Sequence, residues 1–278
     1  MADIIEAKRA FNRRTALTWL LILNGAVFVA LRLVAAFNAF GVAEGWLDIS
    51  VAALSLPASV HALPGAPWSL LTYMFSQYDV SHLLFNMLWL AWFGMFMQND
   101  FGNRPLLLSY FSGGIAGGMA YLLWGAFAPE ASAVSAGLIG SSAAVISVAL
   151  AVAVAEPSRP VYVVFIGHVK LKWVAALMVA IALIWFSGHH PGSDMAHAGG
   201  AVAGIVAGLL CRRIRHASER ASARRVPASE ICAAGALTDS QLLDSLLDKI
   251  RCSGYDSLSV EERATLFSLS QRLKKEQS

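Results

Sequence analysis

The sequence predicts an all-α polytopic membrane protein, in which a bundle of six transmembrane helices is followed by a small C-terminal helical hairpin. Hydrophobic residues make up 57% of the 278-residue chain and charged residues only 14%, whereas a soluble domain carries about 25% charged residues. Residues 15–211 hold few Lys or Arg, which gather before and after them. Two helix-start signatures lie in the polar tail. These observations favour a membrane domain followed by a soluble one.

The first predicted helix follows a basic cytoplasmic leader, residues 1–14. Residues 15–37 are apolar and exceed the about 20 residues that span hydrocarbon. A signal peptide has a shorter apolar core and a small-residue cleavage site, so we expect a retained helix. Residues 39–67 are semi-apolar, broken by Pro and Gly, and free of Lys and Arg. This composition predicts a loop in the membrane interface, anchored by Trp46 and Trp68.

Five further apolar segments complete the predicted membrane domain, residues 15–211. The third span carries two overlaid GxxxG patterns at residues 113–118, which allow close helix contact. The fifth span begins at Trp173 or as early as Val161. The five segments are residues 80–97, 105–126, 142–155, 173–186 and 195–211.

The distribution of basic residues predicts the orientation in the membrane. The connections 39–67, 127–137 and 187–194 contain no Lys or Arg. Because cytoplasmic loops are enriched in Lys and Arg, both termini should be cytoplasmic, a parity that six helices satisfy. We therefore expect a multi-pass protein of the plasma (inner) membrane. The basic residues of the opposite side are Arg104, Arg159, Lys170, Lys172, Arg212, Arg213 and Arg215.

The tail has an organisation of its own. Residues 212–237 are rich in Arg, Ser and Ala, which predicts a basic linker or an extension of the sixth helix at anionic lipid. The signatures Thr238-x-x-Gln241 and Ser259-x-x-Glu262 each open a helix, and Gly254 ends the first helix. Residues 238–278 should therefore form a cytoplasmic helical hairpin. It is either a stabilising tail or the docking site of an unknown cytoplasmic partner.

Several classes of ligand are disfavoured by composition. The net charge of only +3 gives no reason to expect a nucleic-acid partner. A metal site at residues 189–197 is disfavoured because no HExxH motif is present and Pro191-Gly192 breaks the spacing, so no metal or cofactor is expected. The cysteines have no CxxC spacing and are expected to be free thiols. They are Cys211, Cys232 and Cys252.

Four hydrogen-bonding side chains lie at similar predicted depths in the membrane, on three helices that should cross it in the same direction. At about 1.5 Å per residue, Ser142 lies about 21 Å and His197 about 22 Å above the cytoplasmic ends of their helices. Asn86 lies about 18 Å up, with His82 one turn higher. In a hydrocarbon core about 30 Å thick, all four fall toward the outer half.

The helix that begins at Ser142 is too short to span the membrane. It reaches only about 21 Å, so its outer end must begin below the outer surface. The preceding residues 131–141 should then enter the membrane as irregular backbone, which is tolerated only beside protein or a water-filled cavity. We therefore expect a water-accessible cavity that opens outward, as a hydrolase in a membrane requires.

The residue types at this depth suit acyl transfer. A serine hydroxyl becomes a nucleophile when a neutral histidine takes its proton, so Ser142 and His197 form a candidate dyad, with no acidic residue placed for a triad. The oxyanion needs donors, and the candidates are His82, the Asn86 amide and backbone N–H groups near Ser142. Ser141 is rotated by about 100° on a helix and should not face His197.

Each of these residues also has a structural alternative. A lone serine can serve helix packing, a lone histidine can bond to a carbonyl, and His82 and Asn86 can bond between helices; the shared depth favours function. Two faces of mostly small residues should meet here. The faces are His197, Gly200, Gly204 and Gly208 on one helix and Ser142, Ile146, Ala149 and Ala153 on the other.

These motifs resemble the rhomboid family of intramembrane serine proteases. The carriers are Ser81-His82-Leu83-Leu84-Phe85-Asn86, Gly140-Ser141-Ser142 and Ala196-His197-Ala198-Gly199-Gly200 with Gly204. The resemblance covers residues 15–211. It implies a rhomboid-like six-helix core, Ser142 as nucleophile, His197 as base, and His82 with Asn86 at the oxyanion. It also implies residues 39–67 as the membrane-embedded first loop, and transmembrane-helix protein substrates cut near their outer ends. The tail looks like extensions seen on some bacterial rhomboids.

The sequence departs from the family pattern at three positions. The usual glycine after the nucleophile is Ala143, an aromatic four residues after the nucleophile is Ile146, and a histidine five residues before the oxyanion histidine is Gln77. Each departure bears on activity or water retention, so the alternative to a protease is a catalytically weak or inactive rhomboid-like binder of transmembrane clients. A small transporter is disfavoured because no internal repeat is present.

Overall fold

The computed structural model describes residues 15–42, 45–129, 137–163, 166–186, 191–224 and 239–276. The chain divides into a first unit, Met1–Arg215, and a second unit, His216–Ser278. The basic leader, the capping residue Thr238, Cys232 and the residues His189 and His190 lie outside the described residues. The two units are taken in turn.

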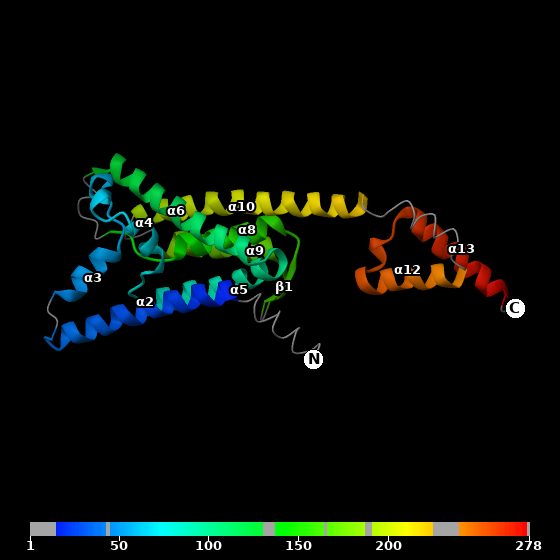
Figure 1. Ribbon diagram of the computed structural model, residues 1–278, viewed down its shortest axis with the longest axis horizontal. Helices are drawn as coiled ribbons and strands as arrows, with labels where there is room; N and C mark the ends of the chain where they lie inside the picture. Colours follow the sequence, from blue (N-terminus) through cyan, green and yellow to red (C-terminus); the bar gives the residue numbers. More distant parts are fainter. Residues whose placement is uncertain are drawn as a thin grey trace. The chain divides into compact units, whose positions relative to one another are not determined.

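Six apolar helices correspond to the six predicted spans among the described residues (Figure 1). By length and composition, four of them could cross a membrane: Ala16–Ala39, Val80–Phe101, Asn103–Phe127 and Gly192–Ala217. Two are shorter, Ser142–Ala155 and Leu171–Ala182. The chain is thus an all-α membrane bundle, and the number of six crossings stays a prediction. The helices are α2 (Thr15–Ala39), α5 (Val80–Phe101), α6 (Asn103–Phe127), α8 (Ser142–Ala155), α9 (Leu171–Phe186) and α10 (Pro191–Arg224).

The short helix α8 is the centre of the first unit. It begins and ends at the residues expected from the sequence, and it packs against α5, α6 and α9 (Figure 1). Almost every residue from Ala143 to Ala155 is buried, on all sides of the helix. A helix that is apolar all round is stable only when neighbours cover it, so α8 owes its position to the surrounding helices.

Glycines on α10 allow its backbone to approach α8. A Cβ at Gly200 would lie 2.3 Å from the carbonyl oxygen of Ala143, and a Cβ at Gly204 would lie 2.5 Å from that of Ser147. Gly208 meets the carbonyl oxygen of Ala151 in the same way. The small-residue face of α10 is therefore used as the sequence predicts.

The predicted partner face on α8 is wrong. The glycines of α10 repeat every four residues, and they pack on the row of α8 with the same repeat, which is Ala143, Ser147 and Ala151. Rows of equal spacing can interdigitate along their length, whereas the mixed spacing of Ser142, Ile146, Ala149 and Ala153 cannot. Ile146 instead lines a pocket against α5 and α9.

The first loop contains regular structure. Residues 39–67 hold α3 (Trp46–Leu54) and the 3₁₀ helix η1 (Val60–Gly65), and the short α4 (Ser69–Thr72) and the 3₁₀ helix η2 (Tyr73–Phe75) follow the loop. Trp46 and Trp68 are exposed, and the Trp68 indole N–H donates to the Ala53 carbonyl at 2.9 Å. This bond joins the start of α4 to α3, while both indole rings remain exposed.

The first loop and η2 both bond to the segment that leads into α8. Leu56 and Leu138 exchange two backbone hydrogen bonds, of 2.9 and 2.8 Å, as an isolated antiparallel bridge. The N–H of Gly140 donates to the carbonyl of Tyr73 at 3.0 Å. Residues 137–141 are irregular backbone surrounded by protein, as expected for a non-helical entry to the fourth helix. Residues 130–136 lie outside the described residues.

The early start considered for the fifth span, at Val161, is wrong. Strands β1 (Pro160–Val163) and β2 (Gly167–Lys170) form a two-stranded antiparallel sheet, and α9 begins only at Leu171. The run Val161-Tyr162-Val163 consists of β-branched and aromatic residues, which favour strands. The small sheet is the one addition to an otherwise helical architecture among the described residues.

Ion pairs join the ends of three helices on the side predicted to be cytoplasmic. Arg159 pairs with Asp100 at the end of α5 and, at 3.2 Å, with Glu156 after α8. Arg215 of α10 also pairs with Glu156. The guanidinium of Arg159 lies over the ring of Phe96 at 4.6 Å. Residues 212–224, predicted as a linker or a helix extension, continue α10.

The second unit contains the expected pair of helices, α12 (Asp239–Ser253) and α13 (Val260–Glu276), joined by the 3₁₀ helix η3 (Tyr255–Ser257). Ser259 and Glu262 form a reciprocal capping box: the Glu262 N–H donates to Ser259 Oγ at 3.1 Å, and the Ser259 N–H donates to Glu262 Oε2 at 2.8 Å. A hydrogen bond from Lys249 chiefly holds the pKa of Glu262 below its usual range. Leu246, Leu258 and Leu269 form a buried cluster among the residues of this unit whose burial the structure describes.

Candidate active site

Ser142 and His197 meet although 55 residues separate them in the sequence. Ser142 Oγ lies 2.8 Å from His197 Nε2, at hydrogen-bonding distance. Ser142 is the first residue of α8, and His197 lies in the second turn of α10 and is 4% exposed. The close approach follows from Gly200, one turn after the histidine, because a side chain there would strike the backbone of Ala143.

Gly140 separates Ser142 from His82. Its φ of +125° lies in the region that favours glycine. A Cβ at this position would lie 3.0 Å from His82 Cε1 and 3.9 Å from Ser142 Oγ. The imidazole and the hydroxyl therefore lie beside the same backbone atom, and a glycine leaves room for both.

The cap of α5 positions His82. Asp79 is the N-cap, and its carboxylate accepts from the His82 N–H at 2.8 Å and from the Ser81 hydroxyl at 2.5 Å. These two bonds, that of Ser81 first, hold the pKa of Asp79 below its usual range. The sequence Asp79-Val80-Ser81-His82 thus starts α5 and places His82 in the first turn of the helix.

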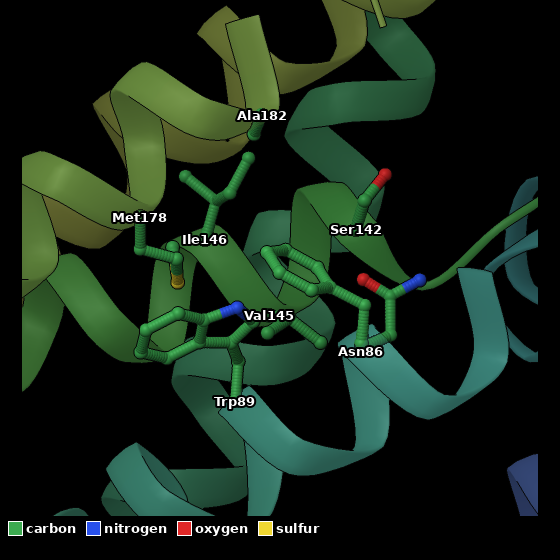
Figure 2. A pocket seen from close by; sticks show the side chains of 8 residues that line it. Asn86, Trp89, Ser142, Val145, Ile146, Met178 and Ala182 are labelled. Carbon is green, nitrogen blue, oxygen red and sulfur yellow. The ribbon is translucent and has the colours of Figure 1, made fainter. Parts of the chain in front are cut away.

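Asn86 lies one turn after His82 on the same helix, and it is 4% exposed. Its Nδ2 donates to Gln77 Oε1 at 2.8 Å. Figure 2 shows Asn86 and Ser142 at the edge of one pocket, with Trp89, Ile146 and Met178 on its walls. The pocket has apolar walls and one amide beside the serine hydroxyl, and its cavity volume of about 10 Å³ is about what one water molecule needs. The expected opening of this pocket to the outer surface stays a prediction.

Ser141 takes a different role from its neighbour. It is fully buried, and its Oγ accepts a hydrogen bond from Gln77 Nε2 at 3.1 Å. Ser142, and not Ser141, therefore lies at hydrogen-bonding distance from His197. The structure brings together all four residues that the sequence singled out, and their catalytic roles stay predictions.

Two of the departures from the family pattern are accommodated by their surroundings. Ala143 is 1% exposed, and its methyl group packs against Gly117. A Cβ on Gly117 would lie only 2.6 Å from this methyl group. A glycine on the neighbouring helix thus leaves space for the methyl group. Ile146 is buried and forms part of the pocket wall.

The sequence reasoning missed Asn24 and Tyr110. Asn24 is fully buried in α2, where it bonds to Gln77 and to Tyr110 of α6. The signal was present, because a polar side chain within the apolar segment 15–37 must find a partner. Nothing in the sequence could tell that the partner is Gln77, which lies 53 residues further along the chain.

Comparisons with known proteins identify a family for this chain. A family model described as a Rhomboid domain matches residues 64–214, more than half of the chain. The chain is also similar to RHOMBOID-like protein 12, mitochondrial, of Arabidopsis thaliana, with 27% identity over 158 residues. That alignment covers 53% of this chain and 47% of the plant protein, so the chain spans about half the length of the curated relative.

Proposed function

Because this chain belongs to the rhomboid family, we propose that it is an intramembrane serine endopeptidase that cleaves transmembrane segments of other membrane proteins. The observation that carries the proposal is the distance of 2.8 Å between Ser142 Oγ and His197 Nε2. A serine at a helix end beside a buried histidine, with a small pocket next to the serine, suits acyl transfer better than helix packing.

The chemistry follows from the dyad. His197 Nε2 takes the hydroxyl proton while Ser142 Oγ attacks the scissile carbonyl carbon. The C–N bond then breaks, the nitrogen leaves with the proton from His197, and an acyl-enzyme remains on Ser142. Water, deprotonated by His197, hydrolyses this ester and frees the serine. No metal or cofactor takes part in these steps.

The oxyanion needs hydrogen-bond donors beside Ser142. The Asn86 amide lines the same pocket as Ser142, and the His82 ring lies near the hydroxyl across Gly140. Backbone N–H groups at the start of α8 have no acceptor within the first turn of the helix and can add to these donors. We assign His82, Asn86 and this helix end to the oxyanion site.

The substrates are transmembrane helices, because the dyad belongs to a membrane bundle and the pocket walls are apolar. The distribution of Lys and Arg supports an orientation with both termini in the cytoplasm, and we assign the chain to the plasma (inner) membrane. The second unit is then cytoplasmic, where an unknown partner could bind its helical hairpin.

The test is cleavage of a single-span substrate by the chain in proteoliposomes. Ser142→Ala should lower the rate by about 10⁴-fold or more, because the remaining groups cannot replace the nucleophile. Ser147→Ala is the matched control: this hydroxyl is buried on the same helix, donates to the Ser109 carbonyl at 2.7 Å, and should be dispensable. Equal cleavage by Ser142→Ala and wild type would exclude the dyad. No cleavage by wild type would favour a silent binder of transmembrane clients.

A further inference from the structure

A row of three buried side-chain amides runs from α2 to the candidate active site. Asn24 and Gln77 are fully buried, and Asn86 is 4% exposed. Gln77 Nε2 donates to Asn24 Oδ1 at 3.1 Å, and Asn86 Nδ2 donates to Gln77 Oε1 at 2.8 Å. We call these three residues the amide relay.

Backbone carbonyls determine which way the relay points. The Leu20 carbonyl can only accept, so the Asn24 atom 2.8 Å away must be the nitrogen. The Met74 carbonyl likewise requires the Tyr110 hydroxyl to donate, at 3.0 Å. That hydroxyl then accepts from the second N–H of Asn24, at 3.0 Å. Both N–H groups of Asn24 are used, and its oxygen faces Gln77.

The orientation passes through Gln77 to Asn86. The oxygen of Asn24 requires the nitrogen of Gln77, whose second N–H goes to Ser141 Oγ at 3.1 Å. Gln77 Oε1 therefore faces Asn86 and selects the nitrogen of that amide. A reversed amide at any step would set two like atoms against each other in a buried place, which is unfavourable.

The last member of the relay stands beside the nucleophile. One N–H of Asn86 goes to Gln77, which leaves a second N–H on the same nitrogen. Figure 2 shows the Asn86 amide next to Ser142, with its oxygen on the side of the apolar pocket walls and its nitrogen on the opposite side. An oxyanion is stabilised by an N–H and repelled by a carbonyl oxygen. The end of Asn86 that faces the oxyanion therefore matters to the reaction.

We propose that Asn24 and Gln77 are positioning residues: they fix the Asn86 amide with its N–H toward the oxyanion, and Gln77 ties this donor to Ser141, next to the nucleophile. The catalytic consequence rests on the proposed function. Gln77, a departure from the histidine of the family pattern, is thus the centre of the relay. A neutral imidazole also has one donor and one acceptor, so either residue type can transmit the orientation.

The first test is kinetic. Gln77→Leu should lower kcat by about 10- to 100-fold, within the loss caused by removing one oxyanion donor, and leave KM within about twofold. Asn24→Leu should also lower kcat, although Asn24 contacts Asn86 only through Gln77. Gln77→His should recover most of the loss. Ser147→Ala, which removes a buried hydroxyl outside the relay, should leave kcat unchanged.

A double-mutant cycle separates positioning from general damage to the fold. In the Asn86→Ala background, Gln77→Leu should lower kcat by less than about twofold, because the group through which it acts is gone. The same factor in both backgrounds, or a change confined to KM, would overturn the proposal.

Thermal denaturation of the same variants gives a readout that does not depend on activity. The losses in Tm caused by Gln77→Leu and Asn86→Ala should not add, because each removes one end of the same bond. Additive losses would overturn the relay whether or not the chain cleaves substrate. Coupled losses in a wild type that cleaves nothing would support the relay and overturn the proteolytic function.

Discussion

At the scale of single residues, small side chains decide what can occupy the space around the dyad. The methyl group of Ala143 lies in a gap left by Gly117 of α6, and Gly200 of α10 meets the backbone of the same alanine. Gly140 leaves space for both His82 and Ser142. The alanine after the proposed nucleophile is therefore accommodated, because Gly117 and Gly200 have no side chains there.

This fit can be tested by exchanging the two side chains. Gly117→Ala alone should destabilise the fold by about 1–3 kcal/mol, because its Cβ would lie 2.6 Å from that of Ala143. Adding Ala143→Gly should recover part of the loss. Recovery should be incomplete, since the new Cβ would also lie 2.8 Å from the Ala196 carbonyl oxygen. Thermal denaturation in detergent measures the loss in the single variant and the recovery in the double variant. Strictly additive losses would contradict the packing of Gly117 against Ala143.

At the scale of elements, the position of α8 depends on backbone contacts with α6 and α10. The row Ala143, Ser147 and Ala151 meets the glycines of α10, and Gly113 of α6 packs against the Ser147 side chain. Without a hydrophobic driving force between helices in lipid, close packing of this kind drives association. The dyad distance is thus a product of helix packing.

A larger side chain in this contact should disrupt it. Gly204→Val should destabilise the bundle by about 3 kcal/mol or more and reduce cleavage, because its Cβ would lie 2.5 Å from the Ser147 carbonyl oxygen, which cannot move by itself. Gly25→Val is the control, since a Cβ on that glycine of α2 meets nothing within 4 Å. Equal Tm values for the two variants would show that the α8–α10 contact is dispensable.

At the scale of the whole molecule, the chain consists of two units with separate cores. The candidate site draws its residues from the first unit alone, on α5, α8 and α10. The second unit closes its own core with Leu246, Leu258 and Leu269 and pairs Lys249 with Glu262 at 2.5 Å. Catalysis should therefore be independent of it.

Truncation after Arg224 tests this independence. The shortened chain should keep kcat and KM within about twofold in proteoliposomes, because its dyad and amide relay are intact; a factor of two corresponds to less than about 0.5 kcal/mol. A large loss of kcat at unchanged Tm would instead assign the hairpin a regulatory role. Leu246→Asp in the full chain is the companion variant, since it disrupts the second core without shortening the protein.

The sequence by itself determined the apolar segments, the first residue of α8 and the residue types of the site. These features are local. Each membrane helix must satisfy its backbone hydrogen bonds within itself and present apolar side chains to lipid along its length, so its composition and length identify it in the sequence. The strands at 160–170 were missed because an apolar run that is β-branched resembles the start of a buried helix.

Only the tertiary structure decided which residues meet. The bridge between Leu56 and Leu138, the face of α8 that receives the glycines, and the bonds of Gln77 to Asn24, Ser141 and Asn86 join segments far apart in the chain. Their geometry depends on how several helices pack at once, and no periodicity within one segment contains that information. The sequence named the proposed reacting groups, while helix packing set the distance between them and the orientation of the amides around them.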